Sequence, residues 1–259
     1  MIRSELQGAV RVLTLERPEV LNAFNTEQFE LLAKTLLAAD ADSSTKVVVL
    51  TGAGRAFSAG ADLAENRPPP EDLEYGFQGC IDILVDFRKP LILAINGVGV
   101  GIGATICGLA DMVYMAESAR LRCPFSALGL TAEACSTYTF PRLMGPQGAA
   151  DFLLGAGWLS AAQCKASGLA LEIFPHEGFL ERVMQEAQNL AGLPLASLLQ
   201  TKKLLMAPHV EAMKAANVAE NEALLGLRGG PANTEAVTAF REKREPDFSD
   251  SDILRDNSR

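Results

Sequence analysis

The sequence predicts an α/β core followed by a helical C-terminal part. Segments typical of strands alternate with segments typical of helices up to residue 178, and only helical patterns follow from residue 179. Apolar residues make up 48% of the 259 residues, which is enough for a large buried core. We therefore expect an α/β core over residues 1–178 and a C-terminal helical region over residues 179–259, which serves packing or assembly more often than catalysis.

The expected elements follow from apolar spacing and from turn residues. Strands are expected at residues 9–15, 46–51, 91–95, 111–116 and 171–174, with a further short strand within 118–123. Helices are expected at residues 26–39, 75–87, 136–144, 149–154, 160–167, 179–191, 195–205, 210–225 and 233–244. Thr26 and Ser160 are expected helix caps, and Pro141 is expected to interrupt its helix. Charges and three consecutive prolines predict a mobile surface loop over residues 64–72.

Composition excludes several classes of function. The net charge of −9 argues against a nucleic-acid or anionic-membrane surface. The sequence has only two histidines, and they lie far apart, which argues against a zinc site and against a Ser-His-Asp triad. None of the five cysteines forms a C-x-x-C pair, which favours buried thiols in a reducing compartment. With no signal-peptide pattern, no membrane-length apolar run and no S-K-L-type ending, the expected location is cytoplasmic.

The stretch over residues 91–104 is the most informative part of the chain. An apolar run ends at Asn96-Gly97, glycines follow at alternate positions, and small residues continue to Ala110. Glycines let the backbone approach a ligand closely, and a helix that begins behind such a turn offers free N–H groups. The stretch predicts a site where main-chain donors hold an anion, or an oxygen that becomes one.

Two other interpretations of this stretch stay open on these residues alone. Residues 99–104 fit the dinucleotide-binding pattern G-x-G-x-x-G/A, with Glu117 as the ribose-binding acid. However, the next expected strand begins at residue 111, and a crossover between parallel strands needs about ten or more residues. The remaining alternative is a tightly packed glycine turn that binds nothing.

A second glycine turn directly follows the strand expected at residues 46–51, and the pair resembles the crotonase (enoyl-CoA hydratase/isomerase) superfamily. Four segments carry the resemblance, in the order that the family has them: Arg17-Pro18 with Leu21-Asn22-Ala23, residues 57–63, residues 96–103 followed by Ala110-Asp111, and residues 239–244. The resemblance covers nearly the whole chain. It implies a spiral core of ββα units that binds an acyl-CoA thioester.

The resemblance also implies the residues of the site. The backbone N–H groups of Ala61 and Ile102 would form an oxyanion hole for the thioester carbonyl. The implied substrate-binding positions are Ala23, Ser58, Ala59, Gly60, Asp62, Leu63, Gly101 and Phe125, with Phe240 and Lys243 reaching a neighbouring subunit's ligand. No metal or cofactor is implied beyond the coenzyme A of the substrate. The family commonly assembles as homotrimers or pairs of trimers.

The reaction depends on which carboxylates are present. Hydratases of this family hold a water between two glutamates, but Thr105 and Phe125 occupy the corresponding positions here. Residues 124–141, which include Glu133, are similar to peroxisomal-type Δ3,Δ2-enoyl-CoA isomerases, in which one glutamate is the catalytic base. The resemblance therefore implies an isomerase of fatty-acid β-oxidation. The alternatives are a hydratase, another crotonase-type enzyme on an unusual acyl-CoA, or an acyl-CoA binder without catalysis.

Overall fold

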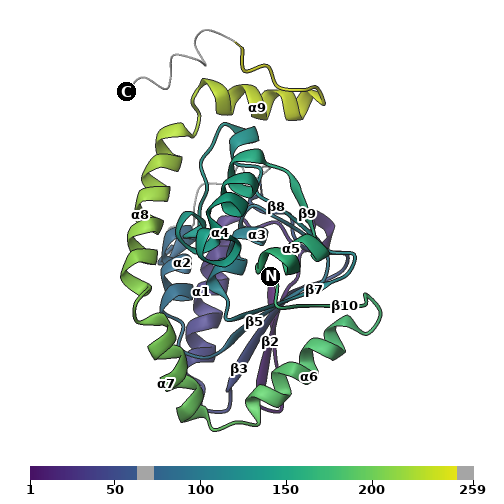
Figure 1. Cartoon of the computed structure of the whole chain (residues 1–259), viewed down its shortest axis with the longest axis vertical. Helices are drawn as coiled ribbons and strands as arrows, with labels where there is room; N and C mark the ends of the chain where they lie inside the picture. The colour runs from purple at the N-terminus through teal and green to yellow at the C-terminus, as the bar shows by residue number, and fades with distance from the viewer. Residues whose placement is uncertain (63–72, 250–259) are drawn as a thin grey trace.

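Two β-sheets form the frame of the protein in a computed structural model that describes residues 1–62 and 73–249 (Figure 1). Within the described residues, the larger sheet has six strands in the order β1-β2-β3-β5-β7-β10, and the smaller has four in the order β4-β6-β8-β9. The strands are β1 Ile2–Gln7, β2 Val10–Leu15, β3 Val47–Gly52, β4 Ala56–Ser58, β5 Leu91–Ile95, β6 Val98–Val100, β7 Met112–Ala116, β8 Arg120–Arg122, β9 Trp158–Ser160 and β10 Glu172–Phe174.

The helices surround these sheets. The α-helices are α1 Thr26–Ala41, α2 Gly76–Asp86, α3 Ile102–Thr105, α4 Ser136–Gly155, α5 Ala161–Ser167, α6 Phe179–Ala191, α7 Leu195–Met206, α8 Val210–Leu227 and α9 Pro231–Glu242. Three short 3₁₀ helices within the described residues are η1 Pro18–Val20, η2 Ile106–Leu109 and η3 Ser126–Leu128.

The chain winds between the two sheets as a spiral. Strands β3, β5 and β7 are parallel neighbours in the larger sheet. Each continues directly into the smaller sheet, where β4, β6 and β8 are again parallel neighbours. Helices follow these strand pairs, so the expected α/β architecture with ββα units is confirmed. The topology brings the loops after β4 and β6 to the same end of the smaller sheet.

The central strands of the larger sheet are fully buried in the hydrophobic core. Every residue of β3 and β5 is buried, and their sequences are runs of Val, Ile and Leu with few polar residues. Such runs are typical of parallel strands that are covered on both faces. Helix α6 packs against β2, β3 and β5 of the larger sheet. The loops of the site therefore start from rigid strands.

Some element boundaries differ from the expectation. Helix α1 is capped by Asn25, not by Thr26, because the Asn25 side chain accepts the Gln28 N–H at 2.8 Å. Helix α4 does not break at Pro141; its kink lies at Gly145, with φ 74° and ψ 160°, because Pro146 disfavours a helical conformation for the residue before it. The N-cap at Ser160 is confirmed by a complete capping box.

The expected strands did not include β1, β4, β6 and β9. The last three have three residues each, and β6 is Val98-Gly99-Val100, in which the glycine hides the strand pattern. The loop expected at residues 64–72 lies outside the described residues.

Helices α7 and α8 lie along one side of the molecule, and α9 lies across its upper end in Figure 1. Helix α8 contacts α2 and α4, and α9 contacts η3. Lys202 of α7 is buried and donates to the carbonyl of Lys89 at 2.8 Å and to the carboxylate of Asp111 at 2.7 Å. None of the helices in the described part of the chain combines the length and apolar character that crossing a bilayer requires.

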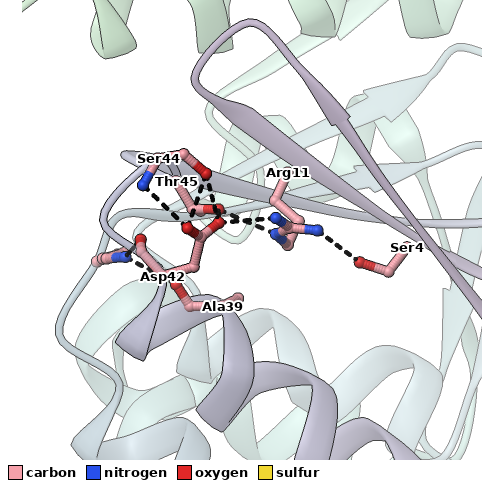
Figure 2. Close-up of polar contacts among 7 residues, drawn as sticks. Ser4, Arg11, Ala39, Asp42, Ser44 and Thr45 are labelled. Atoms are coloured by element: carbon pink, nitrogen blue, oxygen red, sulfur yellow. Dashed lines mark hydrogen bonds and ion pairs between the residues drawn. The ribbon is translucent and has the colours of Figure 1, made fainter.

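The end of α1 is tied to the N-terminal hairpin by a polar cluster. Figure 2 shows the guanidinium of Arg11 between Ser4 and Asp42, to which it donates at 3.1 Å and 2.7 Å. Asp42 also accepts the hydroxyls of Thr45 and Ser44 at 2.7 Å each. These hydrogen bonds hold the pKa of Asp42 well below its usual range, and the bond from the Thr45 hydroxyl has the largest effect. The cluster fixes the turn between α1 and β3 and plays no part in the site described below.

Candidate active site

The first glycine loop leaves one backbone N–H without a hydrogen-bond partner among the described residues. Phe24 forms a parallel bridge with Ala61: its N–H donates to the Gly60 carbonyl at 2.7 Å, and its carbonyl accepts the Asp62 N–H at 2.8 Å. In extended backbone, successive N–H groups point to opposite sides, so the Ala61 N–H points away from Phe24. It has no acceptor among the described residues, as an oxyanion-hole donor requires.

Side chains beside this loop hold its shape. The hydroxyl of Ser58 is fully buried, donates to the Asn22 carbonyl at 2.9 Å and accepts the Gly60 N–H at 3.2 Å. Arg17 donates to the Asp62 carboxylate at 2.9 Å and to the Ala23 carbonyl at 2.8 Å. Ser58 and Asp62 therefore bind protein partners in this structure, which explains why the loop needs them even before a ligand is considered.

The second glycine loop follows β6. Gly101 has φ 55° and ψ −122°, a conformation that side-chain-bearing residues rarely adopt, and helix α3 begins at the next residue, Ile102. The Gly101 carbonyl accepts the N–H groups of Ala104 at 2.8 Å and Thr105 at 2.9 Å. The Ile102 N–H is a first-turn donor, and no acceptor for it exists in the described part of the chain.

The two loops touch each other, and glycines make the contact possible. A Cβ at Gly60 would lie 2.8 Å from the carbonyl oxygen of Val100, and a Cβ at Gly103 would lie 2.6 Å from that of Ser58. Both distances are too short for any side chain. The close approach therefore places the backbone of the first loop, which carries the Ala61 N–H, next to that of the second loop, which carries the Ile102 N–H.

The side chain of Glu133 lies beside the contact between the two glycine loops. Glu133 belongs to a third segment, the loop between η3 and α4. A Cβ at Gly101 would lie 3.9 Å from Oε1 of Glu133 and 3.8 Å from the Cα of Gly60. The carboxylate is therefore beside both glycine loops. Among residues 1–62 and 73–249, no donor forms a hydrogen bond with the Glu133 carboxylate, so its oxygens are available to a substrate. This is the arrangement that a general base needs.

The environment of Glu133 raises its proton affinity. Burial raises the pKa of Glu133 to about 7, and the negative charge of Glu220 adds to that rise, while Arg228 opposes it. A carboxyl group with this pKa can take a proton and return it near neutral pH, because its two forms are then similar in free energy.

The backbone after Glu133 is strained. Ala134 and Cys135 both have left-handed conformations, with φ of 58° and 59°. Each such non-glycine residue costs about 1–3 kcal/mol and persists only where the surroundings enforce it. Such strain is common at functional sites, and here it lies between Glu133 and the start of α4 at Ser136.

The raised pKa of Glu133 carries a prediction for stability. The folded protein binds this proton more tightly than the unfolded chain, so stability is lost as the pH rises from the ordinary value of 4.5 through about 7. The Glu133→Gln variant is therefore expected to unfold at a higher temperature than the wild type at pH 8, and this difference should shrink at pH 5. Thermal unfolding at both pH values checks it, with Glu222→Gln on the exposed side of α8 as the control. A difference that does not depend on pH would contradict the assignment.

Four further predicted residues are outside the contacts described above. Phe125, which is buried, lies at the start of η3, and Leu63 lies outside the described residues. Phe240 is 68% exposed on α9, and Lys243 ends that helix in a left-handed conformation with φ 56°. Their contact with a neighbouring subunit's ligand, and assembly into trimers, stay predictions.

The dinucleotide interpretation loses its structural support. The helix after Gly101 has four residues and passes into the short η2, so it cannot form the crossover helix that a dinucleotide fold requires. Glu117 is exposed in the turn after β7.

Sequence reasoning also missed Glu220, a buried acid on α8 whose carboxylate lies against the turn that follows Glu133. Glu220 lies in a helix of 18 residues, where a glutamate is usually exposed, and no local sequence pattern indicates that this one is buried.

Comparison with known proteins identifies similar chains. The family model described as enoyl-CoA hydratase/isomerase matches residues 5–251. The human enoyl-CoA delta isomerase 2 is 34% identical over 92% of this chain, which spans only 62% of the human protein. The 2,3-dehydroadipyl-CoA hydratase of Escherichia coli K12 is 33% identical over 93% of this chain and 96% of its own length. The crystal structure of an enoyl-CoA hydratase/isomerase from Pseudoalteromonas atlantica has a TM-score of 0.91 at 31% identity, covering 96% of this chain and 99% of that one.

Proposed function

Because the chain belongs to the enoyl-CoA hydratase/isomerase family and has its crotonase fold, we propose that it is an enoyl-CoA isomerase. It converts a 3-enoyl-CoA into the conjugated 2-trans-enoyl-CoA, in fatty-acid β-oxidation. The observation that supports this most is the carboxylate of Glu133, which lies beside the two glycine loops and accepts no hydrogen bond from the described residues. The 34% identity to human enoyl-CoA delta isomerase 2 supports it as well.

The proposed reaction moves one proton along the acyl chain. Glu133 takes a proton from C2, and the electron pair of the broken C–H bond moves into the thioester, giving a dienolate. The N–H groups of Ala61 and Ile102 stabilise the negative oxygen of that dienolate, where one preorganised donor is worth about 3 kcal/mol. The protonated Glu133 then donates the proton to C4, the carbonyl re-forms and the double bond lies between C2 and C3. One carboxylate suffices, since the same group removes and returns the proton.

A hydratase is the second candidate, because the Escherichia coli relative at 33% identity bears that name. Hydration needs a base for water and an acid for the α-carbon. Thr105 is fully buried with its hydroxyl bonded to the Gly101 carbonyl at 3.2 Å, and Phe125 is an apolar residue. With neither position carrying a carboxylate, the site favours a reaction that needs only Glu133.

Ultraviolet absorbance of the conjugated thioester distinguishes the two functions. We expect absorbance to rise when the protein is mixed with a 3-enoyl-CoA and to stay constant with 2-trans-enoyl-CoA. A fall with 2-trans-enoyl-CoA would mean that water is added, which would replace the isomerase with the hydratase. No change with either compound would overturn both candidates and direct the search to other acyl-CoA esters.

A further inference from the structure

The turn that follows Glu133 surrounds one buried carboxylate that belongs to a distant helix. Glu220 of α8 is 5% exposed and accepts three hydrogen bonds from the start of α4. Oε2 accepts the Cys135 N–H at 2.7 Å, and Oε1 accepts the Thr137 N–H at 2.8 Å and the Thr137 hydroxyl at 2.6 Å. All three donors lie within four residues of Glu133.

The backbone of this turn is built to hold an anion. Ala134 and Cys135 are left-handed in succession, and the first turn of α4 follows, so the backbone N–H groups of Cys135 and Thr137 turn toward the same point. Since left-handed non-glycine residues persist only where the surroundings enforce them, the Glu220 contacts are a direct reason for this conformation. The same turn is tied to Glu133 itself, because the Ser136 hydroxyl donates to the Glu133 carbonyl at 2.6 Å.

Burial raises the pKa of Glu220, and the three hydrogen bonds oppose that rise because they favour the ionised form. Both oxygens accept a backbone N–H, so a carboxamide would place its own N–H donors against one of them. A glutamine at position 220 therefore keeps the size of the side chain and loses at least one of the three contacts.

Several charged and titratable groups face Glu133. Glu220 faces it from α8 and Arg228 from the residue after that helix, and the thiol of Cys123 lies beyond the end of β8. The Cys135 thiol follows it in the chain. Burial raises the pKa of both thiols, so they are neutral, and Glu220 is left as the one negative neighbour among the described residues that raises the proton affinity of Glu133.

We propose that Glu220 is a positioning residue: its carboxylate fills the concave turn at Cys135–Thr137 and so fixes the direction in which Glu133 presents its carboxylate to the substrate. This inference rests on the proposed function, because it assigns to Glu220 the orientation of the proposed base. Glu220 acts through the backbone of the turn and does not touch the substrate.

The Glu220→Gln variant tests this role, with Glu222→Gln, an exposed acid on the same helix, as the matched control. We expect Glu220→Gln to lower kcat for a 3-enoyl-CoA by about 10²-fold, since a misplaced catalytic group costs roughly that much, and to leave KM nearly unchanged. The acidic limb of its kcat/KM profile should also move to lower pH, because a negative neighbour of Glu133 is gone. Glu222→Gln should match the wild type in both measurements.

A second variant separates positioning from folding. Glu220→Gly opens the concave turn, and added formate supplies a small carboxylate of the right chemistry. A rise of kcat with formate, but not with chloride at the same ionic strength, supports the inference. Unchanged kcat and pH profile in Glu220→Gln would overturn it, as would a loss of kcat that parallels a loss of thermal stability without any shift of the acidic limb.

The same assay distinguishes this inference from the proposed function. If Glu133→Gln retains full turnover, the proposed function fails whatever Glu220 does. If Glu133→Gln is inactive and Glu220→Gln behaves as the wild type, only the positioning role fails.

Discussion

Replacing Glu133 by glutamine is expected to lower kcat for a 3-enoyl-CoA by about 10²- to 10⁴-fold, the usual contribution of a general acid–base group. The carboxamide has nearly the same shape, so binding of the acyl-CoA should change little. The wild type should show an acidic limb in kcat/KM near pH 7, because only the ionised carboxylate can take the C2 proton and the pKa of Glu133 is about 7. That limb should be absent from the residual activity of the variant.

Steady-state kinetics over pH 5 to 9, together with acyl-CoA binding by calorimetry, measures both expectations. Glu117→Gln is the matched control, because Glu117 is an exposed acid after β7 and away from the two glycine loops. Normal turnover by Glu133→Gln would exclude Glu133 as the base.

Replacing Gly60 by alanine is expected to produce the second largest effect, a loss of about 10²- to 10³-fold in kcat, as for removal of one oxyanion-hole donor. Gly60 has φ 89°, and a Cβ there would lie 2.8 Å from the carbonyl oxygen of Val100. The loop must move away from β6 to relieve that contact. The movement separates the Ala61 N–H from the Ile102 N–H, so that one oxygen no longer meets both.

Gly8→Ala is the control for backbone strain. Gly8 also has a positive φ of 65°, but a Cβ there would meet no atom within 4 Å. Both variants should lose some thermal stability, because a side chain strains a backbone with positive φ. Only Gly60→Ala should lose turnover when kcat is expressed per folded site. Equal kcat values for the two variants would show that the contact between the loops does not align the donors.

Patterns within short stretches of sequence predicted much of this protein. Strand and helix spacing located β3, β5, β7 and the helices from α6 onward, because an apolar face repeats at a period that a single element sets. The second sheet was less visible, since β4, β6 and β9 have three residues each and cannot show a period. The kink of α4 was expected at Pro141 but lies at Gly145, the residue before Pro146. Either proline can disturb a helix, and the sequence pattern does not show which of the two the packing tolerates.

The sequence by itself determined that two glycine loops each follow a strand. Through the family resemblance it also predicted main-chain donors at Ala61 and Ile102, and Glu133 as the base. Only the tertiary structure decided that Gly60, Gly101 and Oε1 of Glu133 lie together, and that Glu220 of α8 holds the turn at Cys135–Thr137. The physical reason is that a local pattern reports how a residue fits its own strand or helix. The direction of a side chain across the space between elements is set by their packing, and that depends on residues far away in the chain.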